Sequence, residues 1–175
     1  ALLSVTPVFA QQCDIIYVTP TGATSGAAGT KDNPADINYA VTLMTPSIRK
    51  VYLSVGIYNL ETAFPLVDDV TFEGGFNSAA NWAKVTNPRT IIIRDSVGVQ
   101  PNPNRVTALE AVGVNNWRVQ DVDFIMTDAP DTVDATVYGL NGVTSYGMYI
   151  DNCSNYSLVR CKVIAGNGGD GGQGA

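Results

Sequence analysis

Four charged residues form the clearest candidate for chemistry in this sequence: Asp121, Asp123, Arg160 and Lys162. Asp121 and Arg160 lie 39 residues apart, and so do Asp123 and Lys162. If a groove collects all four, its basic groups and carboxylates can act together on one substrate. The other interpretation is a ladder of opposite charges on a solvent-exposed face. Charges that are already paired must be separated before they can serve a substrate, so the ladder is favoured.

Three aromatic residues suggest a second kind of site, a platform for sugars. Tyr149, Trp117 and Tyr156 could stack on the apolar faces of pyranose rings. Trp117 and Tyr156 are also 39 residues apart, which favours a structural ladder of stacked rings instead. The neighbouring carboxylates Asp68 and Asp69 would face opposite ways on a strand, so they predict a turn. The sequence therefore assigns no catalytic, cofactor-binding or metal-binding residue, and calcium stays open without a motif to support it.

Composition excludes several classes of function. The chain of 175 residues contains no His, which excludes mechanisms that need an imidazole base and zinc sites that need His ligands. A net charge of −6 argues against binding to nucleic acid or to an anionic membrane surface. The length fits one domain, and 17 Gly with 9 Pro suit a fold with many turns.

The charged and aromatic candidates belong to a repeat. Residues 108–117 align with residues 147–156, and residues 119–124 align with residues 158–163, at a constant offset of 39. Apolar positions match apolar positions and alternate with polar ones, which is the period of β-strands. A repeat of this kind predicts a solenoid of coils, each burying its inner face against the next.

The repeat also predicts where the coils turn. The alternation slips by one residue between Val119 and Val122, and the slip recurs in the second copy, which indicates a tight bend. Asn116 and Asn155 are predicted to stack at another corner, because Asn tolerates turn backbone and can hydrogen-bond along the stack. Residues 128–146 form a polar excursion that leaves the coil and returns.

One helix is expected, over residues 33–44. Asn33 is predicted to cap it, Pro34 suits its first position, and Asp36 places a carboxylate in its first turn. Apolar residues then recur at helical spacing up to Met44. Such a helix can cover the open end of a solenoid and block pairing from edge to edge.

The order of these segments resembles the right-handed parallel β-helices of the pectin-lyase-like kind, in the version found on large exported bacterial surface proteins. The segments that carry the resemblance are residues 15–18, 36–41, 51–58 and 70–76 with Trp82, and 146–166. A right-handed coil is expected because parallel crossovers overwhelmingly take that hand. The fold hosts lyases, hydrolases, adhesins and inert stalks, so it predicts architecture better than activity. Its polygalacturonase-like hydrolases need a His beside their aspartates and are excluded.

The resemblance implies a non-catalytic extracellular β-helix domain of a bacterial cell-surface protein, acting as an adhesin, a stalk or an assembly subunit. The alternative is a polysaccharide-active enzyme, a lyase above all, or a carbohydrate-binding β-helix. In lyases of this fold an arginine or a lysine is the base and carboxylates hold calcium, the roles that the four charged residues would take. A complete lyase needs a long groove, and the chain holds only about four or five coils at this repeat length. The non-catalytic function is therefore favoured.

The chain divides into three expected parts. Residues 1–12 are a signal-peptide remnant or an N-terminal strand, with the export signal favoured, and the segment is too short to span a bilayer. Residues 13–165 form the β-helix domain, and residues 166–175 form a Gly-rich spacer or loop. Cys153 and Cys161 fall on inward positions, where they act as small apolar residues, with a disulfide left open. Cys13 has no evident partner.

The sequence also predicts that the C-terminal end of the solenoid is covered. A terminal coil leaves backbone N–H and C=O groups unpaired and its apolar core open. The Gly-rich residues that follow Val163 contain no amphipathic helix to close it. The expected partner is a further coil, another subunit or another surface or secretion protein, with glycans as a further class of ligand.

Overall fold

A computed structural model gives the structure of residues 14–131 and 141–171. Strands dominate these residues, and short connections join them. The elements in chain order are β1 (Ile15–Ala23), α1 (Ile37–Leu43), β2 (Lys50–Ser54), β3 (Gly56–Leu60), β4 (Phe64–Pro65), β5 (Thr71–Asn77), the 3-10 helix η1 (Ser78–Ala80), β6 (Ala83–Lys84), β7 (Thr90–Arg94), β8 (Arg105–Val112), β9 (Arg118–Gln120), β10 (Val122–Met126), β11 (Thr144–Asp151), β12 (Ser157–Val159) and β13 (Lys162–Ile164).

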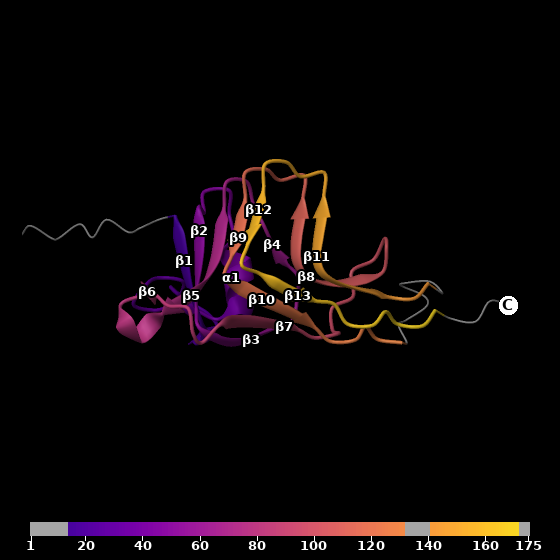
Figure 1. Cartoon of the computed structure of the whole chain (residues 1–175), viewed down its shortest axis with the longest axis horizontal. Helices are drawn as coiled ribbons and strands as arrows, with labels where there is room; N and C mark the ends of the chain where they lie inside the picture. Colours follow the sequence, from indigo (N-terminus) through magenta and orange to yellow (C-terminus); the bar gives the residue numbers. More distant parts are fainter. Residues whose placement is uncertain (1–13, 132–140, 172–175) are drawn as a thin grey trace, which may run out of the picture.

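The strands form three sheets that the chain visits in turn. The first sheet has the order β1-β2-β5-β9-β12, the second β13-β10-β7-β3, and the third β11-β8-β4. Every pairing along these three orders is parallel, whereas β6 adds to β5 in the antiparallel sense. Figure 1 shows the first sheet as a row of strands from β1 to β12. The predicted parallel β-helix is confirmed, and its right-handed sense stays a prediction from the crossover rule.

The repeat of 39 residues sets the register of the last two coils. Arg105 pairs with Thr144 in the third sheet, Arg118 with Ser157 in the first, and Asp123 with Lys162 in the second. The same offset therefore holds in all three sheets, as the sequence predicted. We call the coil of β8, β9 and β10 the inner coil, and the coil of β11, β12 and β13 the terminal coil.

The predicted corners are confirmed by the backbone. Asn116 and Asn155, between the third and first sheets, have φ of 60° and 50°. Asp121 and Arg160, between the first and second sheets, have φ of 57° and 53°. These values lie in the left-handed region, which Asn and Asp enter more readily than most side chains. A residue with positive φ at each corner turns the strand and produces the slip in alternation.

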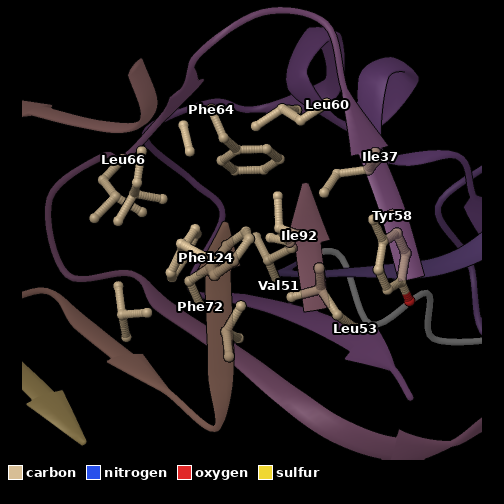
Figure 2. Packing of buried hydrophobic residues seen from close by; sticks show 14 of the residues in the cluster. Ile37, Val51, Leu53, Tyr58, Leu60, Phe64, Leu66, Phe72, Ile92 and Phe124 are labelled. Atoms are coloured by element: carbon tan, nitrogen blue, oxygen red, sulfur yellow. The ribbon is translucent and has the colours of Figure 1, made fainter. Parts of the chain in front are cut away.

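The apolar core fills the space that the three sheets enclose. Phe64 and Phe72 lie with ring centroids 4.8 Å apart, and Phe124 joins them from the next coil (Figure 2). Tyr58 is buried in the same core, and its hydroxyl donates to the carbonyls of Ser54 and Val18. Burial raises the pKa of Tyr58 far above its ordinary value, so this phenol stays neutral.

The helix begins later than predicted. α1 starts at Ile37, and its N-cap is Asp36, whose carboxylate accepts from the N–H of Asn38 at 2.8 Å and of Tyr39 at 3.4 Å. Asn33 is therefore not the cap. The reason is tertiary, because the residues before Asp36 are bound to β1: the Pro34 carbonyl accepts from Ala23 N–H at 2.8 Å.

The helix covers the N-terminal end of the solenoid, as predicted. Ile37 and Ala40 are buried, and α1 packs against β1 and β3, the first strands of two sheets (Figure 1). A second small cluster lies outside the coil, where Trp82 packs edge-on to Tyr17 with centroids 4.8 Å apart and Phe76 stacks on Tyr52.

Several predictions concern the ends of the chain. Cys13 and the rest of residues 1–13 lie outside the described residues, as do residues 132–140 of the predicted excursion and residues 172–175. Within the part of the chain that is described, no helix is long and apolar enough to cross a membrane. The described Gly-rich residues run beside residues 127–131, where Asn167 N–H donates to the Asp128 carboxylate at 2.7 Å and Ala129 N–H donates to the Asn167 carbonyl at 2.9 Å. They also contact Val143, whose carbonyl accepts from Gly169 N–H at 2.8 Å.

Candidate functional site

The four charged candidates gather at one outer corner of the solenoid, between the first and second sheets. Asp121 occupies the turn from β9 to β10, and Arg160 occupies the matching turn from β12 to β13. Other side chains join them from coils nearer the N-terminus. We call this group the charged corner; its members are Glu73, Lys84, Arg89, Gln120, Asp121, Asp123, Arg160 and Lys162.

Asp121 is the centre of the charged corner. Its side chain is 11% exposed, and Arg160 binds both of its carboxylate oxygens, at 2.6 Å from Nε and 2.8 Å from Nη2. Lys84 Nζ lies 2.8 Å from Oδ2, and the Gln120 amide donates to the same oxygen at 3.0 Å. The hydrogen bonds from Arg160, followed by those from Lys84 and Gln120, outweigh burial and hold the pKa of Asp121 well below its ordinary value. The predicted pairing of Asp121 with Arg160 is confirmed.

Asp123 has a different partner from the one predicted. Its carboxylate accepts from Arg89, with Nε 3.1 Å from Oδ2, and Arg89 also donates to the Arg160 carbonyl at 2.8 Å. Lys162 contributes its backbone N–H, which donates to Asp123 Oδ1 at 3.2 Å. Among the described residues no salt bridge involves the Lys162 ammonium. The Asp123–Lys162 side-chain pair is therefore wrong, because Arg89 precedes β7 and reaches the carboxylate from the coil below.

The charged corner is arranged for cohesion more than for proton transfer. A general base needs a pKa near the working pH. Its hydrogen bonds to Asp121 raise the pKa of Arg160, and those to Asp123 raise the pKa of Arg89, so both guanidiniums are held protonated. Within the described residues, no group of three or more acidic, His or Cys side chains is placed to hold a metal ion.

The three aromatic candidates do not meet in one platform. Trp117 is buried in the core, and Tyr156 stacks on it with centroids 4.5 Å apart and planes 10° apart. Tyr149 lies on the outer face of β11, where the Arg105 guanidinium sits 4.4 Å from its ring centroid and Tyr146 packs edge-on. The stacked ladder of Trp117 and Tyr156 is confirmed, and Tyr149 belongs to another face.

Asp68 and Asp69 form the predicted turn. Asp69 has φ of 60°, and the two carboxylates have separate partners. Asp68 accepts from Asn115 N–H at 2.7 Å, whereas Asp69 accepts from the Asn116 amide at 3.1 Å and pairs with Arg49 at 3.4 Å. The Asn155 amide donates in turn to Asn116 Oδ1, so one polar ladder crosses successive coils.

The charged corner contains members that sequence reasoning did not identify. Lys84 lies in the antiparallel excursion of β6, where its Nζ is 2.6 Å from Glu73 and also contacts Asp121. Arg89 precedes β7 and pairs with Asp123. Neither residue belongs to the two aligned copies, so the offset of 39 could not indicate them. The only sequence signal is that both are basic residues between two predicted strands.

The terminal coil presents the second candidate site, the side that no described residue covers. We call this surface the end face; it consists of exposed Tyr156, Leu158 and Val163 with half-buried Met148, Ile150, Cys153 and Cys161. Both cysteines carry free thiols, and the open disulfide alternative is wrong for this pair. Burial raises the pKa of Cys161, which matches the predicted role of a small apolar residue.

Comparison of the chain with models of protein families, with curated proteins and with solved structures gives no match. The architecture and the geometry of these two sites therefore carry the functional argument.

Proposed function

We propose that this chain is a non-catalytic β-helix domain of an exported bacterial cell-surface protein, acting as an adhesin, a stalk or an assembly subunit. One observation carries the proposal: three of the four candidate side chains, Asp121, Asp123 and Arg160, are already bound to neighbouring side chains. Asp121 receives hydrogen bonds from Arg160, Lys84 and Gln120, and Asp123 receives them from Arg89. A substrate would have to break these contacts before it could use either carboxylate.

The fold supports the same proposal. Stacked coils make a rod whose length grows with each coil and whose sides and ends are available for contacts. The charged corner links Glu73 of β5, Lys84 of β6 and Gln120 of β9 through Asp121 to Arg160, and Arg89 links Asp123 of β10 to the Arg160 carbonyl. Such cross-links resist sliding of one coil over the next, which suits a stalk or a scaffold. The apolar residues 1–10 of the sequence add the expectation of export.

A lyase assay tests the proposal. The full chain is incubated with polygalacturonate and with alginate, with and without calcium, and unsaturated uronides are followed by ultraviolet absorbance. The expected result is no release above the buffer blank. Release that is abolished by Arg160→Ala or Lys162→Ala would contradict the proposal and restore the polysaccharide lyase, because these are the two side chains that could serve as base.

A second experiment tests localisation. The gene is expressed in its own cells, and intact cells are treated with a protease before the chain is detected with an antibody. Loss of the signal from intact cells, with a cytoplasmic marker unchanged, is the expected result. Protection of the chain until the cells are broken would contradict the proposed surface location.

A further inference from the structure

We propose that the end face binds one further parallel β-coil, supplied by a partner polypeptide that places carboxylates over Arg160 and Lys162. This inference rests on the proposed function as an assembly subunit and names the partner by its chemistry. Three observations carry it: the apolar residues left exposed, the direction of the hydrogen bonds between coils, and the unpaired positive charge at the edge.

The end face exposes the side chains that the inner coil buries. Val119 is fully buried and its counterpart Leu158 is 45% exposed, while Phe124 is fully buried and its counterpart Val163 is 43% exposed. Trp117 is 1% exposed and Tyr156, which stacks on it, is 46% exposed. A further coil would remove this apolar surface from water, at about 25 cal/mol per Å².

The hydrogen bonds that join backbone N–H groups to side-chain oxygens across the last two coils run in one direction. Side-chain oxygens of one coil accept from backbone N–H groups of the next: Asn115 accepts from Ser154 at 3.0 Å, and Asp128 accepts from Asn167 at 2.7 Å. Asp131 accepts from Asp170 in the same way, at 3.4 Å. The terminal coil has Ser154, Asn167 and Asp170 at these same positions, so it offers acceptor oxygens to the N–H groups of a further coil. That direction specifies a parallel coil in the same register.

The charges specify the edge of that coil. Asp121 of the inner coil forms an ion pair with Arg160 of the terminal coil, and the Arg160 side chain remains 60% exposed. Lys162 is also exposed, and its ammonium makes no salt bridge with the described residues. Neighbouring strands lie about 4.8 Å apart, so carboxylates on a further coil would face both cations directly.

A second copy of this chain does not offer the required edge. Its N-terminal end is covered by α1, and the outer edge of β1 is already bonded. Tyr17 N–H donates to the Gly29 carbonyl at 2.9 Å, and Ala23 N–H donates to the Pro34 carbonyl at 2.8 Å. A second copy is therefore not the occupant, and the proposed partner is one that presents a coil with an acidic corner.

The inner coil supplies a guest for the experiment. A copy of residues 105–131 carries Asp121 and Asp123 where the proposed partner needs carboxylates. This copy is fused behind the full chain through a flexible Gly/Ser linker, which gives an effective concentration on the order of mM. The matched control guest carries Asp121→Lys and Asp123→Lys. The unfused full chain is the reference.

The readout is the alkylation rate of Cys153 and Cys161, followed peptide by peptide by mass spectrometry. Both thiols lie on the end face, so a docked coil covers them. With the acidic guest we expect the alkylation rate to fall about tenfold, because only the undocked fraction reacts. That fraction is about one tenth when the Kd for docking is about one tenth of the effective concentration of the guest. The basic guest should leave the rate near that of the unfused chain. In a host with Lys162→Glu, which leaves the Asp121–Arg160 pair in place, the advantage of the acidic guest should shrink.

Three results would overturn the inference. Equal protection by both guests would show that charge does not select the occupant. Absence of protection by either guest, with hydrogen exchange in residues 157–164 equally unchanged, would show that the end face does not accept a coil. Thiols already protected in the unfused chain, together with a dimer in sedimentation, would make a second copy the occupant. A lyase activity would contradict the proposed function without changing any of these protection results.

Discussion

The inner coil and the terminal coil have nearly the same pattern of residues and very different surroundings. Three residues of the inner coil are at most 1% exposed, and the residues that match them in the terminal coil are at least 43% exposed. The pairs are Trp117 and Tyr156, Val119 and Leu158, and Phe124 and Val163. The pattern of alternation thus specifies which way a side chain points. Burial is decided by whether another coil lies above it, because each coil of a solenoid contacts only its neighbours.

The same comparison holds for charge. Asp121 of the inner coil lies between Lys84 from below and Arg160 from above. Arg160 of the terminal coil has a partner below and solvent above. A pair shielded on both sides is worth more than an exposed one, because solvent and salt screen the exposed charge. Positions in the terminal coil can therefore be compared with covered positions in the coils below it.

The largest difference is expected for truncation of a leucine. Leu109→Ala should lower the free energy of unfolding by about 2–5 kcal/mol, because Leu109 is buried in the inner coil and the change leaves a cavity. Leu158→Ala should cost less than about 1 kcal/mol, because that side chain is already 45% exposed. Urea unfolding followed by circular dichroism measures both. Equal losses would show that the end face is covered in solution.

A smaller difference is expected when a methyl group is added to a glycine. Gly74→Ala should cost about 1–3 kcal/mol, because the new Cβ would lie 2.5 Å from the Asp121 carbonyl oxygen, and the backbone there cannot yield. Gly147→Ala meets the Val163 side chain instead, which lies on the end face and can turn away. Thermal denaturation of the two variants ranks them. A greater loss for Gly147→Ala would indicate that Val163 is fixed by something above it.

Removing a charge from the charged corner should lower the free energy of unfolding more at buried Asp121 than at exposed Arg160. Asp121→Asn should cost about 1–3 kcal/mol near pH 7, because it removes the negative charge and one of the two acceptor oxygens that bind two cations at a nearly buried position. Arg160→Gln should cost less, because Lys84 still holds Asp121 and the Arg160 side chain is exposed. Urea midpoints measure both changes, and a larger loss for Arg160→Gln would contradict this order.

The contribution of Asp121 should depend on pH in a definite direction. The pKa of Asp121 is lower in the folded chain than in the unfolded chain, where it is about 4. The contribution of Asp121 to the free energy of unfolding is therefore fully present above about pH 4 and is lost as pH falls toward the folded pKa. The stability gap between the parent chain and Asp121→Asn should therefore narrow below about pH 4. The gap at pH 7 and at pH 3 is compared by urea titration. A gap that widens in acid would mean that the ion pair is not what stabilises this carboxylate.

The smallest difference is expected in the ladder of asparagines. Asn116→Ala should cost more than Asn155→Ala, by about 1 kcal/mol. Both changes put Ala at positive φ and remove the hydrogen bond between Asn155 and Asn116, but only Asn116→Ala also removes the donation to Asp69. Asn116→Gly removes the same hydrogen bonds without backbone strain, so its loss of stability measures the contribution of those hydrogen bonds. Thermal unfolding midpoints compare the three variants, and equal midpoints for the two Ala variants would show that the hydrogen bond from Asn116 to Asp69 adds nothing measurable.

The sequence predicted well the features that recur in both copies of the repeat. The offset of 39 gave the parallel stacking, the corners at Asn116 and Asp121, and the stack of Trp117 on Tyr156. These features are local or recur at one spacing, so a single alignment contains them. The candidate site was predicted only in part: the Asp121–Arg160 ion pair is present, whereas Asp123 and Lys162 are neighbours in register without a side-chain ion pair between them.

By itself, the sequence determined the strand period, the coil length and the positions at which coils turn, because these depend on alternation and on turn residues along the chain. Tertiary structure alone decided which partner each charge takes: Lys84 and Arg89 come from outside the repeat, and the binding of residues 34 and 35 to β1 moves the helix start to Asp36. It also decided which coil is buried. The physical reason is that a partner or a covering layer is a contact between distant segments, which the spacing of residues along one segment does not contain.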